Sequence, residues 1–200
     1  MKRDSNRFFQ LKNIPNLICV LRILLVYPVV MLILEGDTLF ALVLFVIAGL
    51  SDGLDGFLAK RFHWQSRLGS ILDPLADKLL LVSSYIAMSY VGLIPVWLVV
   101  AAFSRDIIIV SGGFAYHKFI GEFEMAPSFI SKFNTFMQIL LIAGVLSREI
   151  TAIPGFVLDW MIAATLITIV LSGLDYVFVW GKRAWLATRS DSATKTKLEK

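Results

Sequence analysis

Residues 39–59 read LFALVLFVIAGLSDGLDGFLA, an apolar run whose last turns contain Asp52 and Asp55. A helix of about 20 mostly apolar residues can cross the hydrocarbon core of a bilayer. Carboxylates are costly inside such a helix, so an aspartate pair there indicates a functional site. The stretch therefore predicts a membrane helix that carries part of a binding or catalytic site near one end.

Apolar runs of this kind recur along the whole chain. Of the 200 residues, 58% are hydrophobic and 17% are charged, and a soluble domain of this size could not bury so much apolar surface. We therefore predict an all-α integral membrane fold, with one membrane domain over residues 1–181 and a basic, polar, frayed tail over residues 182–200. The six expected transmembrane helices span roughly Ile14–Leu34, Leu39–Ala59, Ser70–Val91, Pro95–His117, Phe129–Leu146 and Pro154–Trp180.

Basic and acidic residues alternate between successive connections. Lysine and arginine gather before the first run, at residues 60–67 and in the tail, whereas Glu35, Asp37 and Glu149 mark the opposite connections. The positive-inside rule then places both termini and the aspartate end of the second helix on the cytoplasmic side, as in a bacterial inner membrane. The net charge of +4 follows from this asymmetry and indicates attraction to anionic lipid, not to nucleic acid.

The third predicted helix starts with a second aspartate pair, Asp73 and Asp77. Spacings of three and four residues place the members of each pair on one helix face. Four carboxylates gathered at one membrane boundary would repel one another without cations, and oxygen ligands are typical of Mg²⁺ or Mn²⁺. Two such ions about 4 Å apart can hold a pyrophosphate and stabilise an in-line displacement. The pattern predicts a two-metal site.

Small residues lie in register with the aspartates. Gly56 and Ala59 continue the face of Asp52 and Asp55, and Gly69 precedes the second pair by one turn. Without bulky side chains, the backbone at these positions can approach a phosphate or a nucleotide closely. The combination favours a nucleotide-binding cleft between the two helices.

Simpler explanations exist for single aspartates. Asp73 followed by Pro74 also fits a helix N-cap with proline at the first helical position. Asp77 could pair with its neighbour Lys78. Neither explanation accounts for the joint spacing of all four aspartates and the small residues, and that joint spacing favours the metal site.

The stretch from Asp52 to Asp77 resembles the signature of the CDP-alcohol phosphotransferases, D-x-x-D-G-x-x-A-R followed after a short connection by G-x-x-x-D-x-x-x-D. Every fixed position is matched except the arginine, which is Lys60 here and is followed by Arg61. Lysine keeps the positive charge but loses the planar fork that holds phosphate oxygens bidentately. Either Lys60 acts as a point charge, or Arg61 contacts the phosphate.

The resemblance implies a role for each matched residue. Asp52, Asp55 and Asp73 would be metal ligands, while Asp77 would both contact the second metal and deprotonate the acceptor hydroxyl. Attack on the β-phosphorus of a CDP-lipid would expel CMP without a covalent enzyme intermediate. The residues expected at the CDP-lipid are Asn16, Asp55, Gly56, Ala59, Lys60 and Gly69.

The entry into the first helix is also similar to the family. Residues 13–19 read NIPNLIC and are followed by Arg22, and the family often has threonine or serine where this chain has Cys19. The resemblance makes Asn16 a candidate nucleotide contact. A helix cap is the alternative role for this asparagine.

Charged residues also interrupt the fourth and fifth predicted helices. Arg105 lies inside the fourth, and an arginine buried in a membrane helix should meet a phosphate or a carboxylate. An ion pair with one of the four aspartates is the alternative without a ligand. The family resemblance implies that basic residues of these helices bind a phosphate on the acceptor, which makes Arg105, Lys132 and Asn134 the acceptor-side candidates.

A finer resemblance is to the CMP-forming cardiolipin synthases, carried by residues 68–78, 93–106 and 127–135. The related enzymes that make phosphatidylglycerol phosphate usually have a second lysine where this chain has Asn134. One positive charge fewer suits the singly charged diester of phosphatidylglycerol better than the dianionic monoester of glycerol 3-phosphate. We therefore expect phosphatidyl transfer from CDP-diacylglycerol to phosphatidylglycerol, giving cardiolipin and CMP. Glycerol 3-phosphate is the alternative acceptor.

Other classes of function fit the sequence less well. Carboxylates between membrane helices also occur in ion channels and transporters, but these need no small residues in register with the acids. A catalytically inactive scaffold would not require all four aspartates. Cys19, His63 and His117 have no partners at metal-ligand spacing, so we expect no thiolate or histidine metal site. The family resemblance implies a homodimer.

Overall fold

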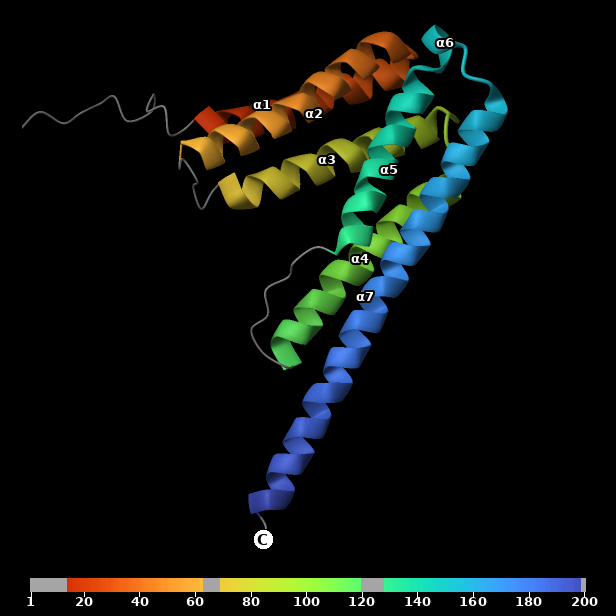
Figure 1. Ribbon diagram of the computed structural model, residues 1–200. Coiled ribbons are helices and arrows are strands. Elements are labelled where there is room, and N and C mark those ends of the chain that lie inside the picture. Colours follow the sequence, from red (N-terminus) through yellow and green to blue (C-terminus); the bar gives the residue numbers. More distant parts are fainter. Residues whose placement is uncertain (1–13, 63–68, 120–127, 199–200) are drawn as a thin grey trace, which may run out of the picture. The chain divides into compact units, whose positions relative to one another are not determined.

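A computed structural model describes residues 14–62, 69–119 and 128–198, and the regular structure in these residues is helical throughout (Figure 1). The predicted all-α fold is therefore confirmed. Six long helices begin close to the predicted apolar runs, and all but the last also end close to them; one short helix precedes the last. The helices are α1 (Ile14–Glu35), α2 (Thr38–Arg61), α3 (Gly69–Tyr90), α4 (Val96–Phe119), α5 (Phe129–Leu146), α6 (Arg148–Thr151) and α7 (Gly155–Leu198).

Four of the described helices are long and apolar enough to cross a membrane, with spans at Asn16–Glu35, Val96–Gly113, Phe129–Leu146 and Gly155–Val179. In α2 the described apolar stretch is shorter, Thr38–Leu54, and it already contains Asp52. Helix α3 likewise contains Asp73 and Asp77. These spans support an integral membrane protein, while the count of six spans and the cytoplasmic placement of both termini stay predictions.

The chain forms two compact units, and each is described by itself. The first comprises Met1–Pro95 with Ile142–Leu158, and the second comprises Val96–Leu141 with Asp159–Lys200. In the first unit, α1 packs against both α2 and α3, which contact each other far less. Helix α1 is therefore the element that sets the positions of both aspartate-bearing helices.

Left-handed glycines follow the ends of α1 and α3. Gly36 adopts a left-handed conformation (φ +82°), and the N–H of Asp37 donates to the carbonyl of Leu32 at 2.9 Å. Gly92 ends α3 in the same way, with the N–H of Leu93 donating to the carbonyl of Met88 at 2.8 Å. Such a left-handed residue satisfies the last carbonyls of a helix, and glycine adopts that conformation without strain.

The structure excludes one alternative and corrects one expectation about helix ends. Helix α3 already begins at Gly69 and Pro74 lies inside it, so Asp73 is a helical residue and not an N-cap. Helix α7 continues to Leu198, so residues 182–198 are helical where a frayed tail was expected. In both places local composition was outweighed by continuation of a helix that neighbouring residues had started.

Candidate active site

The aspartates of α2 and α3 meet at one arginine of α1. Nη1 of Arg22 donates to Oδ1 of Asp52 at 2.9 Å and to Oδ1 of Asp77 at 2.6 Å. The side chain of Arg22 has 0% exposure, whereas those of Asp52 and Asp77 are 45% and 43% exposed. The guanidinium thus lies on the buried side of the two carboxylates, and the carboxylates remain accessible from the other side.

A second contact joins α1 to α3 one turn away. The thiol of Cys19 donates to Oδ1 of Asp73. Cys19 is fully buried and Asp73 is partly exposed, as in the arginine pairs. Cys19 and Arg22 are three residues apart on α1, and Asp73 and Asp77 are four apart on α3, so each helix presents one face to the other.

The structure therefore brings two of the four predicted metal ligands, Asp52 and Asp77, together at Arg22, and Asp73 lies one turn from Asp77 on α3. The side chain of Asp55 lies outside the described residues, as do those of Ala59 and Lys60. Sequence reasoning placed the aspartates correctly on facing helices but assigned no function to Arg22, although an arginine in an apolar helix is a signal in itself.

The other described residues that were predicted to contact the CDP-lipid lie on the same three helices. A Cβ atom added to Gly56 would meet no described atom within 4 Å, so packing does not require glycine there. Gly69 is buried at the start of α3, and Asn16 is half-buried in the first turn of α1. Because α1 begins at Ile14, Asn16 lies inside the helix and is not its N-cap. Arg61 is exposed at the end of α2.

The aspartate cluster has the donor set that a divalent cation requires. Carboxylate oxygens are the preferred ligands of Mg²⁺ and Mn²⁺. The described cluster contains three aspartates and one arginine. Among the described residues, no three acidic, histidine or cysteine side chains are already grouped as a metal site, since Arg22 lies between two of the carboxylates. The residues fit a divalent ion in chemistry and charge.

The second unit has its own buried arginine, Arg105 of α4. Its Nε and Nη2 donate to Oγ of Ser172 on α7 at 3.1 and 2.5 Å, and Nη2 also donates to Oγ of Ser131 on α5 at 2.5 Å. Nη1 donates to Oδ1 of the adjacent Asp106 at 2.7 Å. Gly173 lies beside this arginine, and a Cβ atom added there would be in ordinary van der Waals contact with Cγ of Arg105, at 3.8 Å.

Another polar contact between α5 and α7 lies one turn away. Asn134 is fully buried, and its Oδ1 accepts a hydrogen bond from Oγ1 of Thr168 at 2.9 Å. Nδ2 of Asn134 has no acceptor among the described residues. A buried amide donor without a partner is costly, so it is an observation that points to a ligand.

The acceptor-side candidates are thus only partly brought together. The hydrogen-bonded side chains between α4, α5 and α7 form a polar seam. Arg105 contacts Ser131 of α5 in this seam, and Asn134 lies one turn further along α5. The side chain of Lys132 is exposed and makes none of these contacts. The carboxylate partner of Arg105 is Asp106, not one of the four aspartates. Sequence reasoning missed Ser172, because serine in a membrane helix commonly bonds its own backbone, as Ser111 does here.

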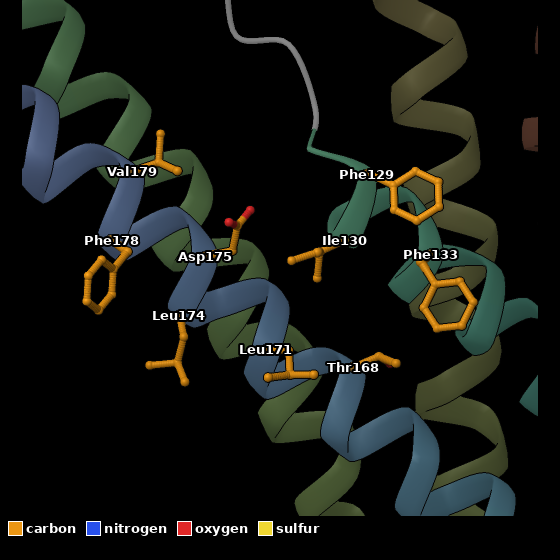
Figure 2. A pocket seen from close by; sticks show the side chains of 9 residues that line it. All are labelled: Phe129, Ile130, Phe133, Thr168, Leu171, Leu174, Asp175, Phe178 and Val179. Carbon is orange, nitrogen blue, oxygen red and sulfur yellow. The ribbon is translucent and has the colours of Figure 1, made fainter.

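An apolar groove of about 610 Å³ lies beside this seam (Figure 2). Its walls come from the first turns of α5 and from residues 168–179 of α7. Thr168 and Asp175 are the polar members of an otherwise apolar lining. The lining residues are Phe129, Ile130, Phe133, Thr168, Leu171, Leu174, Asp175, Phe178 and Val179.

A helical membrane chain with an acidic cluster of this kind fits the class of enzymes that transfer substituted phosphate groups. Residues 12–180 match the CDP-alcohol phosphatidyltransferase family, so the chain belongs to that family. The resemblance drawn from the aspartate signature is thereby confirmed, and the channel and transporter alternative is set aside.

Known relatives include cardiolipin synthases and a glycerol-3-phosphate phosphatidyltransferase. The chain is 39% identical to a cardiolipin synthase (CMP-forming) of Rattus norvegicus and 37% identical to that of Homo sapiens, each over 154 residues, 69% of this chain and 51% of the relative. It is 32% identical to a CDP-diacylglycerol–glycerol-3-phosphate 3-phosphatidyltransferase of Aquifex aeolicus over 169 residues, 82% of this chain and 93% of the relative. The chain thus spans about half the length of the two synthases.

Proposed function

We propose that the protein transfers the phosphatidyl group of CDP-diacylglycerol to a hydroxyl of phosphatidylglycerol. The acceptor oxygen forms a bond to the β-phosphorus, the bond from that phosphorus to the CMP oxygen breaks, and the acceptor proton passes to Asp77. Cardiolipin and CMP are the products. The observation that carries the choice of acceptor is the setting of Arg105, whose charge is already offset by Asp106 and whose other partners are neutral hydroxyls.

The aspartates would supply the catalytic groups. Asp52, Asp55, Asp73 and Asp77 would hold Mg²⁺ or Mn²⁺, which would offset the charge of the pyrophosphate. Asp77 would act as the general base, and its contact with Arg22 fixes the orientation of its carboxylate. The partial exposure of Asp52 and Asp77 supports access of a substrate from the open side.

On the donor side, Asn16, Asp55, Gly56, Ala59, Lys60 and Gly69 would contact the CDP-lipid. The open space beside Gly56 supports this role, because neither packing nor backbone conformation explains a glycine there. Either Lys60 or the exposed Arg61 would contact phosphate. The site would face the cytoplasm of a bacterial inner membrane, and the enzyme would act as a homodimer.

On the acceptor side, Arg105 and Asn134 would bind the phosphodiester, with Lys132 at the exposed edge. The hydroxyls of Ser131 and Ser172 accept hydrogen bonds from Arg105, so their own hydrogens can donate to an anion. A site with one arginine, neutral donors and a neighbouring carboxylate suits a monoanion better than a dianion. The apolar groove supports a lipid acceptor, since apolar clefts of several hundred Å³ bind apolar groups.

Glycerol 3-phosphate is the second candidate acceptor. The observation in its favour is the Aquifex aeolicus relative, whose length the aligned region covers to 93%. In that case the same aspartates would act on a soluble phosphomonoester, and the product would be phosphatidylglycerol phosphate.

An acceptor assay separates the two. Purified protein in mixed micelles receives CDP-diacylglycerol and Mg²⁺ with phosphatidylglycerol, with glycerol 3-phosphate, or with neither, and mass spectrometry identifies the lipid product. We expect cardiolipin and CMP with phosphatidylglycerol and little product with glycerol 3-phosphate. Phosphatidylglycerol phosphate as the main product, without cardiolipin, would establish the second candidate.

A further inference from the structure

Arg22 has no role in the aspartate signature, yet it is the residue at which three helices of the first unit meet. It is fully buried in α1 and contacts Asp52 of α2 and Asp77 of α3 through one nitrogen, Nη1. A buried arginine is costly unless carboxylates compensate it, and clustered carboxylates repel one another unless a cation lies among them. Each group therefore stabilises the other.

The position of the guanidinium separates it from the substrate side. Arg22 has 0% exposure, while the side chains of Asp52 and Asp77 are nearly half exposed. A residue behind the carboxylates cannot reach a phosphate in front of them without displacing them. Arg22 is thus placed to act on the aspartates and not on the CDP-lipid.

We propose that Arg22 is a positioning residue that serves as the internal counter-cation of the aspartate site. Its charge holds α2 and α3 against α1 before a divalent ion binds. A bound divalent ion would supply the same compensation from the exposed side. Arg22 and the ion would then repel each other and share the oxygens of Asp52 and Asp77. The part of this inference that concerns metal rests on the proposed function.

The test measures thermal unfolding of the full chain in detergent, in excess chelator and in saturating Mg²⁺. Arg22→Gln should lower the unfolding temperature by about 10 °C in chelator and by clearly less in Mg²⁺. The matched control is Arg105→Gln, which removes a buried arginine whose partners are two serines and Asp106. Its loss should be equal in both conditions. An equal loss for Arg22→Gln in both conditions would overturn the proposal.

Binding of Mn²⁺, followed by electron paramagnetic resonance, gives an independent readout. Removal of a positive charge beside the ligands should tighten Mn²⁺ binding by about tenfold in Arg22→Gln, whereas Arg22→Lys should stay close to the unmodified protein. Weaker binding by Arg22→Gln would mean that Arg22 only preorganises the ligands, and would overturn the counter-cation role.

A double substitution keeps the inference testable without any metal. If Arg22 compensates excess negative charge, Arg22→Gln combined with Asp52→Asn should be more stable in chelator than Arg22→Gln alone. A double variant that is less stable than Arg22→Gln would overturn the proposal. Absence of any Mg²⁺ or Mn²⁺ effect on the unmodified protein would reject the proposed metal site instead. The two failures are distinguishable, because Arg22→Gln and the double variant are compared in chelator alone.

Discussion

Two arginines are buried among the residues that the structure describes, and their surroundings differ. Arg22 in the first unit contacts the carboxylates of Asp52 and Asp77. Arg105 in the second unit contacts the hydroxyls of Ser131 and Ser172, and one carboxylate, that of its neighbour Asp106. The same residue type therefore lies in an acidic cluster in one unit and in a nearly neutral, donor-rich cluster in the other.

The difference shows how a membrane chain can prepare for ligands of opposite charge. Around Arg22 the aspartates outnumber the arginine, and this composition suits the cation site that we propose there. Around Arg105 the charges cancel, while the hydroxyls and the amide of Asn134 provide donors for an anion. Each of the following experiments removes one side of this contrast, beginning with the largest expected effect.

Removal of divalent ions should abolish activity, because the acidic cluster then lacks the charge that offsets the pyrophosphate. CMP release from CDP-diacylglycerol is measured in excess chelator and again after addition of Mg²⁺ or Mn²⁺, which should restore it. Chelator already saturated with Mg²⁺ is the control and should have no effect. Full activity in excess chelator would contradict the two-metal proposal.

Asp77→Asn should lower turnover by at least about a hundredfold, the usual scale for loss of a general base. The amide keeps the size of the side chain and one oxygen for Arg22, and Asp52 still compensates the arginine, so the fold and CDP-lipid binding should be kept. Turnover is measured as CMP release, with Asp159→Asn, an exposed position on α7, as the matched control. Near-normal turnover of Asp77→Asn would exclude it as the base.

Arg105→Lys should raise the KM for the acceptor by about tenfold, since lysine cannot make the forked contacts that guanidinium makes. The KM for CDP-diacylglycerol should remain unchanged. Both constants come from titrations at saturating partner substrate, and Arg148→Lys, which is exposed, serves as the control. A raised KM for the donor with a normal acceptor KM would move Arg105 out of the acceptor site.

The smallest effect is expected at Cys19. Serine can still donate to Asp73, so Cys19→Ser should lower turnover by no more than about threefold, whereas Cys19→Ala should lower it by about fivefold through loss of one neutral hydrogen bond. Initial rates of CMP release distinguish the two. Equal losses in both variants would show that the donated hydrogen bond to Asp73 is unimportant.

Much of the fold follows from the apolar runs. Phe129–Leu146 was predicted at both ends, because Pro127 and Ser128 precede the helix and Ser147 and Arg148 follow it. The start of α3 was harder to predict, since Asp73 before Pro74 fits both a helix start and a position inside the first turns. Proline inside α3 forfeits only the bond from its own nitrogen to the carbonyl four residues earlier, and this cost is tolerated close to the helix start.

The end of α7 was predicted wrongly. The composition of residues 182–198 lacks an apolar face, which predicts fraying when the segment is considered alone. In the structure these residues continue a helix that begins at Gly155. Adding a residue to an existing helix is far easier than starting one, so the preceding span determines the outcome.

The candidate site was predictable wherever residues of one helix face share a spacing. The two aspartate pairs are such a case. Their partners were not predictable, because Arg22 lies 30 residues from Asp52 and 55 from Asp77, and only packing of three helices brings them together. Ser172 is a similar case, although the adjacent Gly173 is a signal for close approach of another helix.

Cys19 is the single cysteine of the chain, and it is fully buried against Asp73. A thiol reagent can therefore modify it only during transient separation of α1 from α3. When such opening is fast, the labelling rate relative to that of a free thiol gives the free energy of local opening at the aspartates. No cysteine has to be introduced for this measurement, and no second cysteine has to be removed. Any molecule that binds the closed site would slow the labelling in proportion to its occupancy.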